Sequence, residues 1–248
     1  MTNNPSSNKR KPTLDDWLLR MDALQETADT LVWALEFVIE SAPVGHRISL
    51  GFLRKSTNSL KAIRLLAREG LYEECQILTR AVFEMRVTFE CFVRMLREND
   101  REACYRVLDA MMLEKIKQLE SVDYYPDAPA DIRPSREVWE KKKARIVERY
   151  PSAEIRAMRR HGFTGISIET RCRQVGELSA YNTIYRNFSR NVHSTDYVEQ
   201  FGDDLQGSDF PDYLDARNSI MFGVTYNCVK WVAEWVNNLL ERPVDLKS

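Results

Sequence analysis

The chain has 248 residues, 44% of them hydrophobic and 29% charged, and its 36 basic and 37 acidic side chains leave a formal net charge of −1. These proportions are typical of a folded globular protein and exclude a disordered chain, and the near-zero charge gives no global field for a nucleic acid or a membrane. No segment reaches the ~18 consecutive apolar residues of a membrane span, so we expect a cytoplasmic protein rather than a membrane or secreted one. The five cysteines have no C-x-x-C spacing, and we expect no metal or other cofactor.

The N-terminal half predicts four helices. Residues 1–12 are polar and basic, and we expect a disordered tail there. Thr13 and Asp16 form a capping-box pattern that begins a helix reaching about residue 38. A second helix is expected over about 48–69, ending at Gly70. A third, over 72–96, is apolar on nearly all sides, which indicates a central, buried helix. Asp100 is expected to cap a fourth, with apolar residues at Tyr105, Leu108, Met111, Met112, Ile116 and Leu119.

The second half alternates helices with Pro-, Gly- and Asp-rich loops. A loop over 123–134 precedes a charged helical hairpin at about 133–160 that Pro151 interrupts. Residues 161–167 are expected to be irregular, 178–199 to be helical and 201–211 to form an acidic loop before a last helix that ends ahead of Pro243. No segment predicts a strand. The pattern therefore predicts an all-α bundle of about six to eight helices, forming a single domain over 13–243.

One stretch of the 178–199 helix combines side chains that suit phosphate chemistry. At about 100° per residue, a stripe forms from Asn182, Arg186, Ser189, Arg190, His193 and Tyr197, opposite an apolar side with Tyr181, Ile184, Tyr185, Phe188 and Val192. Guanidinium groups counter charge on phosphate oxygens, and an imidazole transfers a proton near neutral pH. The alternative is the solvated face that any surface helix shows.

The spacing of Arg186-Asn187 and His193 resembles the R-x(4–6)-H motif of the HEPN superfamily (higher eukaryote and prokaryote nucleotide-binding). Many members are helical, metal-independent ribonucleases of toxin–antitoxin and antiviral systems. The resemblance implies that Arg186 and His193 are catalytic, that Asn187, Ser189 and Arg190 support them, and that a homodimer forms the shared cleft. It also implies RNA or a nucleotide as ligand and a neutralising protein as partner.

A second resemblance, to an uncharacterised bacterial helical family, covers roughly residues 50–198. It is carried by residues 70–74, 78–80 and Glu84, and by the spacing of Tyr181, Tyr185, Ser189 and His193. It implies a fold and no activity.

Two charged residues lie one turn apart on the helix expected to be central, Arg80 and Glu84. Because burying a charge without a partner is costly, each needs a partner. One interpretation is a structural ion pair. The other is that Glu84 orients His193 or Arg186 as a supporting carboxylate.

The hairpin is the one local charge anomaly, with ten basic and four acidic residues over 133–160 and a net charge of +6. It holds the candidate RNA-binding residues Lys141, Lys142, Lys143 and Arg145, whose affinity for RNA should fall steeply with salt. The alternative is a solvated face with ordinary i, i+4 pairing.

From the sequence, the leading hypothesis is a metal-independent endoribonuclease of HEPN type that acts as a toxin or defence effector. The alternative is a non-enzymatic helical module that binds a nucleotide or a partner and regulates it. A third interpretation is a surface helix of a scaffold protein. The first two differ in whether His193 is needed for turnover or only for affinity.

Overall fold

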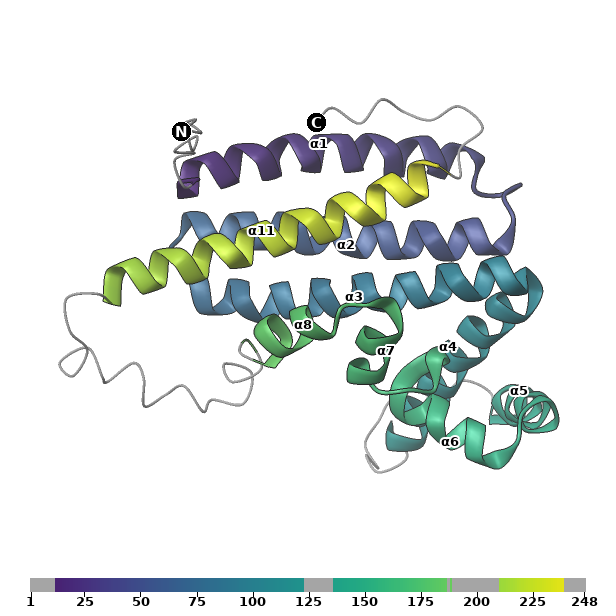
Figure 1. The fold of residues 1–248 in the computed structure, drawn as a ribbon. Helices are drawn as coiled ribbons and strands as arrows, with labels where there is room; N and C mark the ends of the chain where they lie inside the picture. Colours follow the sequence, from purple (N-terminus) through teal and green to yellow (C-terminus); the bar gives the residue numbers. More distant parts are fainter. Residues whose placement is uncertain (1–11, 123–135, 187, 189–209, 239–248) are drawn as a thin grey trace, which may run out of the picture. The chain divides into compact units, whose positions relative to one another are not determined.

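A computed structural model describes residues 12–122, 136–186, 188 and 210–238 (Figure 1). The expected tail, apart from Pro12, the loop over 123–134 and most of the acidic loop over 201–211 lie outside these ranges. The regular elements of the described part are all helical and include no strand, so the all-α class is confirmed. No helix in this part is long and apolar enough to cross a bilayer.

The chain divides into two compact units. Unit 1 comprises residues 1–41, 50–86 and 182–248, and unit 2 comprises residues 42–49 and 87–181. Helices α2 (Val44–Arg68) and α3 (Tyr72–Glu98) each contribute to both units. The expectation of a single domain over 13–243 stays a prediction.

In unit 1, α1 (Leu14–Val38) lies along α11 (Phe210–Asn237), as Figure 1 shows. The predicted capping box begins α1: Thr13 Oγ1 accepts from the Asp16 amide, and the Asp16 carboxylate accepts from the Thr13 amide at 2.7 Å. The Trp17 indole donates to Ser219 Oγ at 3.0 Å. A Cβ at Gly223 would lie 3.3 Å from the Trp17 ring, so glycine at this position lets the two helices approach closely.

The unit-1 part of α3 packs against α11 through a buried hydrogen bond between the hydroxyls of Thr79 and Thr225, 2.8 Å apart. The prediction that α3 is a buried helix is confirmed for most of its apolar residues, while Ile77 is 38% exposed. The core of unit 1 contains Met21, Leu31, Leu53, Leu60, Ile63, Val82, Phe83, Met221, Phe222, Val229 and Val232.

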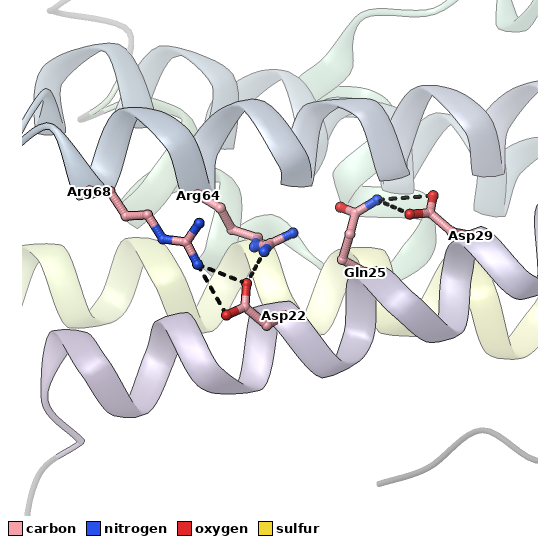
Figure 2. Close-up of polar contacts among 5 residues, drawn as sticks. All are labelled: Asp22, Gln25, Asp29, Arg64 and Arg68. Atoms are coloured by element: carbon pink, nitrogen blue, oxygen red, sulfur yellow. Dashed lines mark hydrogen bonds and ion pairs between the residues drawn. The ribbon is translucent and has the colours of Figure 1, made fainter.

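Polar side chains join α1 to α2 within unit 1 (Figure 2). Asp22 accepts from Arg64 and, at 3.1 Å, from Arg68. Gln25, 7% exposed, donates its amide to both carboxylate oxygens of Asp29 at 3.1 Å. The Gln25 Oε1 atom and the Arg64 Nε atom are buried without a hydrogen-bond partner among the described residues. The contacts of Asp22 with Arg64 and Arg68 join α1 to α2, whereas Gln25 and Asp29 interact within α1 and leave the Gln25 carbonyl unsatisfied.

Unit 2 contains the predicted charged hairpin, formed by α5 (Arg136–Arg149) and α6 (Ser152–His161), packed on α4 (Asp100–Val122). Its core is the cluster of Leu113, Ile146, Tyr150 and Met158. The predicted irregular segment contains a short 3-10 helix, η2 (Gly162–Thr164).

The structure differs from the sequence-based expectations at several helix ends. Asn99 caps α4 in place of Asp100, since Asn99 Oδ1 accepts from the Glu102 amide at 3.1 Å. Helix α2 begins at Val44 instead of about residue 48, because the Pro43 carbonyl already accepts from the amides of His46 and Arg47.

A further helix, α7 (Ile168–Val175), was not expected. The Ser167 side chain caps its start, and Gly176, with φ of 83°, ends it in the left-handed conformation. Both residue types are helix-end signals that the sequence carried. On α4, Leu108 and Met111 are 44% and 55% exposed, so the apolar pattern there is only partly buried.

Candidate functional site

The structure describes part of the predicted site. Arg80, Glu84 and Arg186 lie in unit 1 and are described. Asn187, Ser189, Arg190 and His193 lie outside the described residues, as does Tyr197 of the predicted stripe. Their arrangement, and the shared cleft of a homodimer, therefore stay predictions.

Arg186 follows an unusual turn of backbone. The short helix α8 (Leu178–Ala180) leads into η3 (Tyr181–Tyr185), a π-helical segment. Because a π turn closes i→i+5 hydrogen bonds, the α-helical spacing of 100° per residue does not hold across η3. Such turns occur frequently at functional sites. Between Asn182 and Arg186, the first two residues of the predicted stripe, the spacing is therefore not that of a regular α-helix.

The distribution of polar and apolar residues around Arg186 agrees with the sequence pattern in the described part. Arg186 and Asn182 are exposed, whereas Ile184 and Phe188 are buried and Tyr185 is half-buried. The buried apolar side chains anchor the segment, and Arg186 lies on its exposed side.

Arg80 finds its partner in Tyr185. Its Nη2 atom donates to the Tyr185 hydroxyl at 2.8 Å, and its guanidinium carbon lies 4.4 Å from the centre of the same ring. This combines a charge-assisted hydrogen bond with a cation–π contact. Tyr185, the residue directly before Arg186, is therefore bound to α3 through Arg80. The partner that the sequence predicted for Arg80 is the Tyr185 side chain.

Glu84 is half-buried on α3, one turn from Arg80. Its predicted role in orienting His193 or Arg186 stays a prediction, because His193 lies outside the described residues.

The cysteines are packing residues. All five are buried, and Cys75 donates its thiol to the Ile63 carbonyl at 3.4 Å. Burial raises the pKa of Cys75 to about 12 and that of Cys104 to about 11. Since the thiolate is the nucleophile, these thiols are unreactive at neutral pH. Within the described ranges, no group of three or more His, Cys, Asp or Glu residues is placed to hold a metal ion.

The basic side chains of the hairpin differ in how far their charge is already neutralised. Lys143 donates to Glu120 of α4 at 3.0 Å, which holds the pKa of that carboxyl below its usual range. Lys142 lies over the Trp139 ring, with its Nζ 4.7 Å from the ring centre. Of the four predicted RNA-binding residues, Lys142 and Lys143 are thus engaged within the protein.

Two further arginines of the hairpin are paired with α4. Arg149 contacts Asp109 at 2.5 Å and lies over the Tyr105 ring, and Arg159 lies 3.7 Å from Glu120. The sequence could not reveal these pairings, because the partners lie on a different helix and tens of residues away.

Arg145 remains exposed and makes no ion pair with a described residue. The same holds for Arg156 and Arg160 on α6, which the sequence-based set of RNA-binding residues did not include.

A comparison with protein families finds one match, over residues 46–207, to a family of unknown function, DUF5677. The matched region includes Arg80, Glu84, the hairpin, Arg186 and His193. No curated protein matches the chain. No solved structure matches it.

Proposed function

The chain belongs to the DUF5677 family of unknown function, and from the residues of the matched region we propose that it is a metal-independent endoribonuclease whose catalytic residues are Arg186 and His193. The observation that carries the proposal is the setting of Arg186. It is exposed, follows a π turn, and is preceded by a tyrosine that Arg80 holds in place. An exposed guanidinium that directly follows an anchored tyrosine suits the binding of a phosphate.

The reaction we propose is an internal transfer at phosphorus. His193 takes the proton from the RNA 2′-hydroxyl, whose oxygen attacks the adjacent phosphorus. Arg186 stabilises the negative charge that builds on the phosphate oxygens, since a preorganised cation acts most strongly on charge that develops in the transition state. The bond to the 5′-oxygen breaks, and that oxygen takes up a proton as it leaves. The products are a 2′,3′-cyclic phosphate and a 5′-hydroxyl.

Supporting roles follow from the motif. Ser189 and Arg190 position the phosphate, and Asn187 supports Arg186. Arg80 acts as a positioning residue through Tyr185. A homodimer, with a pair of catalytic residues from each copy, and a role as a toxin or defence effector belong to the same proposal.

The test is cleavage of a mixed RNA pool in EDTA by the wild type and by the variants His193→Ala and Arg186→Ala. Each has a matched control outside the site: His161→Ala at the end of α6, and Arg97→Ala on the exposed side of α3. We expect fragments with 2′,3′-cyclic phosphate ends from the wild type and both controls, and a loss of about 100-fold or more in each site variant, the usual contribution of a general base or a charge-stabilising group.

Folding of every variant is checked by circular dichroism. Absence of cleavage by folded, dimeric wild type would reject the ribonuclease and leave the non-enzymatic binding module. Equal losses in the site variants and the controls would reject the assignment of Arg186 and His193.

The role of Glu84 is tested separately with Glu84→Gln. If the carboxylate orients the catalytic residues, cleavage falls about 10-fold or more while the melting temperature is unchanged. A fall in melting temperature with unchanged cleavage indicates a structural ion pair instead.

A further inference from the structure

The outer face of α6 differs in charge from the rest of the hairpin. With the buried Met158 as reference, the helical spacing places Ser152, Ala153, Arg156 and Arg160 on the opposite side, and all four are exposed. The one carboxylate of α6, Glu154, is directed elsewhere and pairs with Arg106 of α4. This face therefore carries two guanidinium groups and no acidic side chain.

The pairing pattern across the hairpin makes these arginines stand out. The basic residues that point toward α4, Lys143, Arg149 and Arg159, are matched by Glu120 and Asp109. Arg156 and Arg160 have no ion-pair partner among the described residues. The intramolecular carboxylates thus neutralise one side of the hairpin and leave the α6 face positive.

Helix stability alone does not account for both arginines. Arg160 lies in the last turn, where a cation interacts favourably with the helix dipole. Arg156 lies one turn earlier, beyond the reach of that effect. Like charges at i, i+4 destabilise a helix, and α6 has only 10 residues, too few to be stable by itself. An anion bound between the two guanidinium groups would remove this repulsion.

We propose that the α6 face, defined by Arg156 and Arg160, binds the phosphodiester backbone of single-stranded RNA. The proposal takes its ligand class from the ribonuclease proposed above. Arginine is suited to this role because its planar fork binds two phosphate oxygens at once. An anionic membrane fits the face less well, since Ser152 and Ala153 offer no large apolar side chain to insert among lipids.

The proposal assigns RNA contact to residues other than the lysine run that the sequence favoured. Lys142 and Lys143 already interact with Trp139 and Glu120, so removing their charges should change RNA binding little. The contrast between two pairs of cations on one hairpin is what makes the inference testable.

The experiment measures binding of a fluorescein-labelled 20-nucleotide oligouridylate RNA by fluorescence anisotropy at several salt concentrations. The full chain carries His193→Ala throughout, so that cleavage does not interfere. On this background, the double variant Arg156→Gln/Arg160→Gln is compared with Lys142→Gln/Lys143→Gln on the same hairpin and Lys55→Gln/Lys61→Gln on the exposed side of α2. All three lose two positive charges.

Losing two phosphate contacts should weaken binding about 10–30-fold near 0.1 M salt and reduce the slope of log K against log salt by about 1.4, at about 0.7 per contact with a single strand. The two control pairs should change affinity less than about 3-fold.

Three results would overturn the inference: no binding of the RNA by the folded chain at 50 mM salt, equal losses in all three double variants, or binding to phosphatidylserine vesicles with none to RNA. Binding that depends on Arg156 and Arg160 in a chain that cleaves no RNA would support the surface and reject only the ribonuclease. RNA cleavage that does not depend on Arg156 and Arg160 would support the ribonuclease and reject the α6 face as its RNA-binding surface.

Discussion

The buried amide of Gln25 makes a strong prediction about stability. Its nitrogen donates to Asp29, but its oxygen is buried without a partner among the described residues (Figure 2). An unsatisfied buried carbonyl costs about 1–3 kcal/mol. Replacing Gln25 with methionine keeps the length and approximate volume of the side chain while removing that oxygen.

The substitution also removes the hydrogen bonds to Asp29. Asp29 is exposed, so water can replace the lost donor and the loss lies at the low end of the usual 0.5–1.5 kcal/mol, at about 0.5 kcal/mol. The net effect of Gln25→Met is then a gain of about 1 kcal/mol in the free energy of unfolding. For a chain of this size that corresponds to a rise of about 2–4 °C in melting temperature.

The assay is urea denaturation followed by circular dichroism at pH 7, with melting curves on the same samples. The matched control is Gln118→Met, at an exposed position of α4, which should change stability by less than about 0.5 kcal/mol. A loss of stability in Gln25→Met would refute the reasoning, because it would mean that the amide oxygen accepts a hydrogen bond in solution.

Two further predictions concern unit 2. Burial raises the pKa of Tyr150 to about 12, so the folded state holds the phenol proton more tightly than the unfolded state. This contribution is complete below pH 10 and is lost as the pH rises to 12; Tyr150→Phe should therefore lose about 2–3 kcal/mol less stability than the wild type between pH 9 and pH 12, measured by urea denaturation. Arg106, 17% exposed, donates to the Phe163 carbonyl at 3.2 Å and pairs with Glu154. Arg106→Met should cost about 2–4 kcal/mol by leaving both acceptors without a donor, whereas Arg97→Met at an exposed site should cost less than about 0.5 kcal/mol; similar values for the two would contradict this role.

Much of the fold could be predicted because its signals are local. The capping box of Thr13 and Asp16, the break at Pro151 and the 3.6-residue apolar period each depend on residues within one or two turns. The helix α7 was missed although its signals, Ser167 and Gly176, were present, because eight residues are too few to show a period. Local sequence signals were therefore sufficient to predict the long helices of the described part.

The candidate site could be predicted only in its composition. The motif identified Arg186, and the burial of Ile184 and Phe188 followed from the apolar pattern. The π turn was not foreseen, because the sequence was interpreted with a regular α-helical period. The hydrogen bond from Arg80 to Tyr185 joins residues 105 positions apart in the sequence, and no local sequence pattern predicts such a contact.

By itself, then, the sequence determined the longer helices, most of their apolar faces and the residue types available for phosphate chemistry, since these depend on propensity and periodicity. Only the tertiary structure decided which charged side chains form ion pairs within the protein. Lys143, Arg156 and Arg160 look alike in the sequence, but Glu120 lies against Lys143, and no described carboxylate pairs with the other two. Electrostatic neutralisation depends on distance in space, and helix packing sets that distance.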